Sequence, residues 1–188
     1  MAQDGLYELG FEPALAAICS PPLRSPENGQ QLASALVRGD LDLLSTDHCE
    51  FSLKTKSAAA GAGFPKVPNG CGGVGERVVF SYSHLVATGL MESAAWIQAI
   101  ASRPAELMGL DGRKGRLEPG HDADIVLFDP RHEHCWEPLG ASDRPGSLWA
   151  GQQVTGAVRD VWLRGRQVVA GSRLVIDQPG GIFLPRHL

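Results

Sequence analysis

Apolar positions in the first half of the chain alternate between short strand-like runs and helical spacing. Leu15–Cys19 and Leu41–Ser45 are apolar runs of strand length. Between them, Ser25 followed by Pro26 predicts the start of a helix, and Gly39 predicts its end. A strand–helix–strand order of this kind predicts parallel pairing of the two runs.

The middle of the chain changes from an irregular stretch to helical patterns. Phe51 to Gly75 is rich in glycine and has no regular period, so we expect a long loop that contains a turn at Pro68-Asn69-Gly70. Helical spacing follows over Glu76–Thr88 and Glu92–Ser102, and Pro104 opens a last short helix.

After Asp111 the pattern is that of β-structure, with short apolar runs separated by glycine and aspartate turns. Asp122–Pro130 predicts a buried strand. Val158–Leu163 and Gln167–Val169 flank a polar turn and predict a hairpin. We therefore expect two parts, an α/β part over residues 1–110 and a small β-sandwich lobe over 111–188.

Composition narrows the class of protein. The chain has 188 residues, fewer than the roughly 250 of a complete (β/α)₈ barrel, and 43% are hydrophobic, which is enough for a buried core. The net charge of −4 argues against nucleic-acid or membrane partners. Asp4 and Glu8 stand where a signal peptide would be basic and then apolar, so we expect a cytoplasmic protein.

The four cysteines are widely spaced and form no C-x-x-C pair. Reduced thiols are the simplest interpretation for a cytoplasmic protein, and a zinc knuckle or a disulfide framework is the alternative.

Thr46-Asp47-His48-Cys49 follows the second predicted strand directly. The carboxyl ends of parallel strands carry the active sites of α/β proteins, so a carboxylate and an imidazole there are candidates for chemistry. Position alone equally allows Asp47 to cap a turn with His48 packed beneath it. The glycines of Gly70–Gly75 lack the lysine and hydroxyl residue of a phosphate-binding loop.

Several short stretches, in order along the chain, resemble the dihydropyrimidinase/hydantoinase branch of the amidohydrolase superfamily. They are Ser20-Pro21-Pro22-Leu23-Arg24, Thr46-Asp47-His48-Cys49, Pro68-Asn69-Gly70, Arg113-Lys114-Gly115, Gly120-His121-Asp122-Ala123-Asp124, Phe128-Asp129-Pro130 and the tail Gly181-Ile182-Phe183-Leu184-Pro185-Arg186. The resemblance implies an α/β fold: the C-terminal part of a TIM-type (β/α)₈ metallohydrolase barrel over 1–110, followed by a small β-sandwich lobe.

The same resemblance implies a zinc-dependent hydrolase that opens cyclic amides at a binuclear metal site. Asp47 matches the aspartate that binds one metal ion and carries the proton from the attacking hydroxide to the leaving nitrogen. Ser20 and Asn69 match positions whose backbone groups hold the cyclic amide, so both are expected substrate contacts.

Most of the family's metal ligands have no counterpart here, and the resemblance places them in sequence that would precede Met1. The pair His132-Glu133-His134 falls in the predicted β lobe, where we interpret it as surface residues rather than ligands. Lys54 and Lys56 fall in the predicted loop and cannot replace the family's carboxylated lysine. Glu50 and Arg103 stand where the family has proline and asparagine.

Three hypotheses follow. The chain is a cyclic amidase whose remaining ligands come from a partner chain, or a non-catalytic scaffold that forms homo-oligomers, or a truncated product without a role of its own. One carboxylate cannot hold two zinc ions, so we expect this chain alone to bind little zinc.

Overall fold

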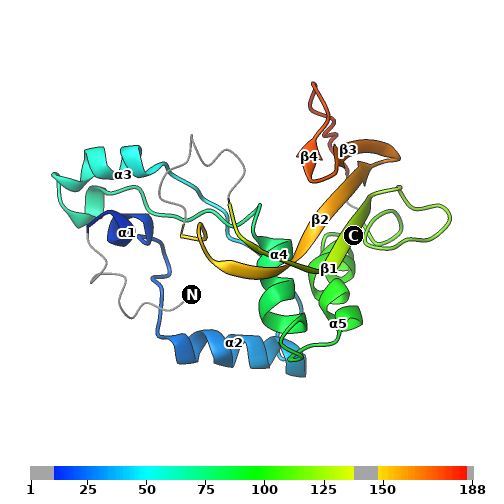
Figure 1. Ribbon diagram of the computed structural model, residues 1–188, viewed down its shortest axis with the longest axis horizontal. Helices are drawn as coiled ribbons and strands as arrows, with labels where there is room; N and C mark the ends of the chain where they lie inside the picture. Colours follow the sequence, from blue (N-terminus) through cyan, green and yellow to red (C-terminus); the bar gives the residue numbers. More distant parts are fainter. Residues whose placement is uncertain (1–10, 138–147, 186–188) are drawn as a thin grey trace. The chain divides into compact units, whose positions relative to one another are not determined.

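The computed structural model describes residues 11–137 and 148–185 (Figure 1). Contacts divide these residues into two compact units. The first holds 11–38, Ser45–Arg77, 134–137 and 148–153, and the second holds Gly39–Leu44, Val78–Glu133 and 154–185. The boundary at residue 110, which came from sequence, remains a prediction.

The first unit is built mainly from helices. They are α1 (Phe11–Ala16), α2 (Pro26–Arg38), α3 (Leu53–Ala60) and a 3₁₀ turn, η1 (Phe64–Lys66). Helix α2 begins at the predicted proline, and Gly39 follows its last residue with a φ of 82°. Because glycine adopts this left-handed conformation without steric cost, the predicted end of the helix is confirmed.

Helix α3 lies inside the stretch that the sequence predicted to be an irregular loop, so that part of the prediction is wrong. Ser52 Oγ accepts a hydrogen bond from Thr55 N at 3.1 Å and caps the helix. The residues that follow end in three consecutive alanines, the strongest helix formers. Local capping and helix propensity thus outweigh the abundance of glycine farther along the segment.

The two predicted strands of the first half are not strands. The first overlaps α1, which ends at Ala16, and Leu41–Ser45 has no regular secondary structure. A strand exists only where a neighbour completes its ladder of hydrogen bonds. Across residues 11–124 the structure contains no strand, so these two runs have no partner for parallel pairing.

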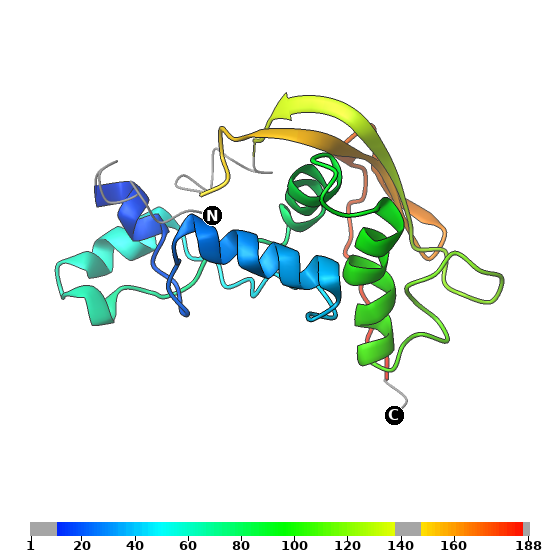
Figure 2. The same ribbon diagram turned by 90° about the horizontal axis from the view of Figure 1, so that it is seen from below.

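The second unit contains the predicted helices, two of which continue into π-helical turns. They are α4 (Arg77–Ser81) with η2 (Tyr82–Val86), α5 (Ser93–Ile97) with η3 (Gln98–Ser102), and α6 (Arg103–Leu107), seen from a second side in Figure 2. Their positions confirm the helical spacing found over Glu76–Thr88 and Glu92–Ser102. None of the helices that the structure describes is both long and apolar enough to cross a membrane.

One four-stranded sheet follows, with the order β1-β2-β3-β4. Its strands are β1 (Ile125–Cys135), β2 (Gln153–Leu163), β3 (Arg166–Ala170) and β4 (Arg173–Leu174). Strands β2 and β3 form the predicted antiparallel hairpin, in which Leu163 pairs with Arg166. The two turn residues both have positive φ, 49° at Arg164 and 78° at Gly165, as a type I′ turn requires. The described residues form this single sheet, so they do not by themselves build a two-sheet sandwich.

An aromatic cluster stabilises the second unit. The ring centroids of Tyr82 and Phe128 lie 4.7 Å apart, and Trp96 lies 5.3 Å from Tyr82. Trp96 is buried, and its Nε1 donates to Ser81 Oγ at 2.8 Å. Gly156 has a φ of 102°, and a Cβ there would lie 2.4 Å from Phe128 Cζ. The rings therefore occupy the space that a side chain at this position would need.

We expect Gly156→Ala to lower the free energy of unfolding by about 3 kcal/mol, because it adds a clash with the aromatic rings to the cost of a left-handed alanine. Gly120→Ala is the matched control, because Gly120 has a φ of 96° but open space around it. Its cost should be about 1 kcal/mol. Urea unfolding measures both, and equal losses would contradict the packing argument.

Candidate functional site

Three segments that are distant in sequence meet within the first unit. They run from Ala16 to Ser20, from Thr46 to Cys49 and from Asn69 to Val74. Gly70 N donates to Ile18 O at 3.0 Å, and Cys49 N donates to Cys71 O at 3.0 Å. The segment that contains Gly70 is therefore hydrogen-bonded to both of the others.

The two expected substrate residues, Ser20 and Asn69, are in direct contact. Asn69 Nδ2 donates to Ser20 Oγ at 2.6 Å, although 49 residues separate them in sequence. Both residues lie in segments without helix or strand, so their backbone groups are not used by a regular ladder. The structure brings the pair together, and the substrate-binding role remains a prediction.

Asp47 has a φ of 46°, in the left-handed region that residues other than glycine rarely adopt. Aspartate is among the residues that tolerate this conformation best. Its side chain is exposed, and it lies in the segment that pairs with Cys71. The backbone thus turns sharply at the candidate catalytic carboxylate.

His48 attaches this turn to the segment that follows Asn69. Its Nδ1 accepts hydrogen bonds from Gly73 N at 3.1 Å and from Val74 N at 3.3 Å. An imidazole nitrogen that accepts two N–H groups carries no proton, so in the neutral ring the proton lies on Nε2. The sequence left open whether the His48 imidazole packs beneath a turn or takes part in catalysis. In the structure it anchors the turn at Asp47 to the segment after Asn69.

Lys56 is the most deeply buried large side chain of the described residues, at 1% exposure. Its Nζ donates to Ala16 O at 3.0 Å, to Ile18 O at 2.9 Å and to Gly70 O at 2.8 Å. An ammonium group has three N–H donors, and all three are used. Burial lowers the pKa of Lys56, which nearby cysteines oppose. The lysine therefore ties the segment before Ser20 to the segment after Asn69.

Sequence reasoning missed this role because it placed Lys56 in a loop. The lysine instead lies in α3, and α3 packs against α1 (Figures 1 and 2). The available signals were the capping serine at position 52 and the alanines after Lys56. They would have predicted the helix, but not which carbonyl groups the ammonium meets.

Gly70 explains why the segments approach so closely. A Cβ at this position would lie 2.2 Å from Cys49 O and 2.8 Å from Cys49 Cβ. Backbone atoms of Cys49 therefore occupy the space of a side chain, and only glycine fits. Nearby, Trp149 Nε1 donates to Gly72 O at 3.0 Å, which holds the same segment from another side.

The described residues do not fit a zinc site. Within 11–137 and 148–185, no group of three or more histidine, cysteine, aspartate or glutamate side chains is placed to hold a metal ion. A zinc ion needs about four ligands, so Asp47 alone is insufficient. The pair His132 and His134 lies in β1 and belongs to no such group.

The two residues that depart from the family pattern lie in different surroundings. Arg103 donates from a guanidinium nitrogen to Asp42 O at 3.1 Å in the second unit. Glu50 lies beside Gly72, where a Cβ would be 3.3 Å from its carboxylate. Neither observation assigns a chemical role.

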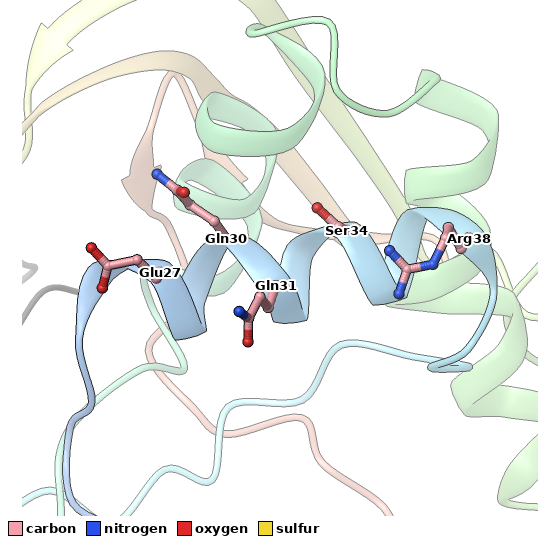
Figure 3. Close-up of a pocket in the computed structure, with 5 residues that line it drawn as sticks. All are labelled: Glu27, Gln30, Gln31, Ser34 and Arg38. Carbon is pink, nitrogen blue, oxygen red and sulfur yellow. The ribbon is translucent and has the colours of Figure 1, made fainter.

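A hollow of about 470 Å³ lies along α2 and contains none of the candidate residues (Figure 3). Its lining residues are polar and all come from this one helix: Glu27, Gln30, Gln31, Ser34 and Arg38. Of the residues that the structure describes, those that line the hollow belong to this one helix, so they do not enclose a ligand in the manner of an active-site cleft.

Comparison with known proteins identifies the family. Residues 8–168 match the amidohydrolase family. A D-hydantoinase of Streptomyces coelicolor is 33% identical over 190 residues, which is 99% of this chain and 40% of that protein. A D-phenylhydantoinase of Escherichia coli O81 is 31% identical over 176 residues, and this alignment covers 93% of this chain and 38% of that protein.

Solved structures agree. A D-hydantoinase crystal structure superposes with a TM-score of 0.85 at 31% identity, and the superposition covers 93% of this chain and 38% of the D-hydantoinase chain. The dihydropyrimidinase of Brevibacillus agri has a TM-score of 0.85 at 30% identity with the same coverage. The chain belongs to the amidohydrolase family, and the resemblance to hydantoinases and dihydropyrimidinases is confirmed. It spans about 40% of the length of these relatives.

We expect Lys56→Met to lower the free energy of unfolding by about 3 kcal/mol or more, because three carbonyl groups lose a charged donor at once. Lys54→Met is the matched control, since Lys54 is exposed in the same helix and should change stability by less than about 0.5 kcal/mol. Urea unfolding of both variants checks this. Equal stabilities of the two variants would refute the role of Lys56.

Proposed function

We propose that this chain is part of an enzyme that hydrolyses the ring C–N bond of cyclic amides such as hydantoins and dihydropyrimidines. The contact between Ser20 and Asn69 is the observation that carries the proposal. Two residues expected to hold one substrate must lie together, and here they do so from positions 49 residues apart. The names of the similar proteins give the substrate class.

In this proposal the backbone groups of Ser20 and Asn69 bind the amide of the ring. A cyclic amide offers one N–H donor and one carbonyl acceptor, which match a backbone carbonyl and a backbone N–H. Asp47 receives a proton from the attacking water and delivers it to the ring nitrogen as the bond breaks. His48 and Lys56 position the segments that carry these groups.

Zinc belongs to the proposal for the complete enzyme and not to the described residues by themselves. We propose that Asp47 contributes one ligand and that the remaining ligands come from polypeptide outside these residues, as in a split enzyme whose other part is a partner chain. We also propose that the chain supplies the last part of a (β/α)₈ barrel and part of a β-sandwich lobe. A non-catalytic scaffold that oligomerises is the alternative function.

Complementation tests the proposal. The chain would be co-expressed with the segment of the Streptomyces coelicolor D-hydantoinase that its alignment leaves uncovered, and ring opening of hydantoin and dihydrouracil would be followed by ultraviolet absorbance. We expect activity in the assembled complex and a loss of at least about 10³-fold in Asp47→Asn, because an amide cannot carry the proton. Asp42→Asn, an exposed aspartate five positions earlier, should stay within about twofold. A stable complex without hydrolysis, or an active Asp47→Asn variant, would exclude the catalytic role and favour the scaffold.

Metal content gives an independent prediction. Each zinc ion needs about four ligands, and the chain alone offers too few, so the purified chain should contain well below one zinc ion per molecule. The assembled complex, with the remaining ligands supplied, should contain about two. Inductively coupled plasma mass spectrometry measures both. Two ions in the chain alone would contradict our assignment of ligands.

A further inference from the structure

Both asparagines of the chain, Asn28 and Asn69, are followed directly by glycine. Asparagine before glycine is the pair most prone to deamidation, because glycine has no side chain to shield its backbone nitrogen. That nitrogen attacks the side-chain amide carbon of the asparagine, so the reaction needs a free backbone N–H and a mobile side chain. The hydrogen bonds of the fold therefore decide whether each pair reacts.

The Asn69 side chain is accessible to water but is held in one direction. It is exposed, and its Nδ2 donates to Ser20 Oγ at 2.6 Å. The nitrogen that would attack it is also engaged, since Gly70 N donates to Ile18 O at 3.0 Å. Reaction at this pair therefore requires that the hydrogen bond of Gly70 opens and that the Asn69 side chain leaves Ser20.

The surroundings of Gly70 hold that hydrogen bond closed. Lys56 Nζ donates to Gly70 O at 2.8 Å and to Ile18 O at 2.9 Å, the same carbonyl that accepts Gly70 N. Gly70 is buried, and a Cβ added to it would lie 2.2 Å from Cys49 O, so its backbone has no room to shift. The attacking nitrogen is thus controlled by the hydrogen bonds of the lysine.

We propose that Asn69–Gly70 is a latent deamidation site, which reacts when the hydrogen bond between Gly70 N and Ile18 O opens. Hydroxide then removes the amide proton of Gly70, the nitrogen forms a bond to Asn69 Cγ, and ammonia leaves from that carbon. The product is a cyclic succinimide. One water molecule opens it at either carbonyl and leaves an aspartyl or an isoaspartyl residue at position 69, with no oxidation or reduction.

The reaction changes the segment that carries an expected substrate contact. An isoaspartyl residue adds a methylene group to the main chain and turns the former backbone carbonyl of Asn69 into a free carboxylate. The carbonyl that would bind the cyclic amide is then lost. This consequence rests on the proposed function, whereas the chemistry of the site does not. Deamidation is read from peptide mass rather than from hydrolysis, so the two proposals can fail separately.

The other asparagine is a control within the same chain. Asn28 and Gly29 are exposed and lie in α2, and they take no part in the three hydrogen bonds of Lys56. Local opening around the lysine should leave deamidation at Asn28 unchanged, whereas unfolding of the whole chain should accelerate it at both positions. The ratio of the two rates therefore separates a local opening from global unfolding.

Peptide mapping of the full chain measures both rates, because trypsin places Asn28 in residues 25–38 and Asn69 in residues 67–77. The protein would be incubated at mildly alkaline pH and digested at mildly acidic pH, and the mass gain of deamidation would be followed in each peptide. We expect Asn69 to react at least about tenfold more slowly in the native chain than in guanidinium, because it must wait for a local opening. Equal rates would overturn the proposal.

Two variants test what keeps the site closed. Lys56→Met should raise the native rate at Asn69 about tenfold and leave Asn28 unchanged, and Lys54→Met should alter neither. If Lys56→Met unfolds, both asparagines accelerate together and Ser20→Ala decides. Loss of this exposed hydroxyl frees the Asn69 side chain and should raise its rate about threefold. An unchanged rate at Asn69 in folded Lys56→Met, or in Ser20→Ala, would overturn the proposal.

Discussion

The ammonium group of Lys56 is the constraint on which the candidate site depends. It is 1% exposed and saturates its three donors with the carbonyl groups of Ala16, Ile18 and Gly70. None of these segments has a strand ladder among the described residues to satisfy its backbone, so a buried cation takes the place of that ladder. Such an arrangement is stabilising only while every donor is paired, which makes it sensitive to loss of the one lysine.

The candidate residues follow from this framework. Lys56 binds the carbonyl of Ile18, two residues before Ser20, and the carbonyl of Gly70, the residue after Asn69. The 2.6 Å contact between Asn69 and Ser20 therefore depends on the two segments that the lysine joins. His48 extends the framework to Asp47 by accepting two N–H groups from the segment after Asn69.

The sequence predicted the local features well, because each depends on neighbouring residues alone. Ser25 and Pro26 marked the start of α2, and the polar turn at Arg164 and Gly165 marked the hairpin. The motifs also identified the family. The sequence could not show that Lys56 is buried or that His48 accepts backbone hydrogens, because both depend on contacts between distant segments. Apolar runs were taken for strands because periodicity does not reveal whether a neighbouring strand exists.

Amide hydrogen exchange in wild type and Lys56→Met tests the central role of the lysine most directly. Gly70 N donates to Ile18 O, which also accepts a hydrogen bond from Lys56 Nζ. Cys49 N donates to Cys71 O, to which Lys56 is not bonded. If the ammonium group holds the 16–20 segment against the 69–74 segment, on which Cys49 in turn depends, the Gly70 and Cys49 amides lose protection in parallel in the variant. The protection of the Trp96 amide in the second unit is then unchanged. Unchanged protection at Gly70 and Cys49 would contradict the account.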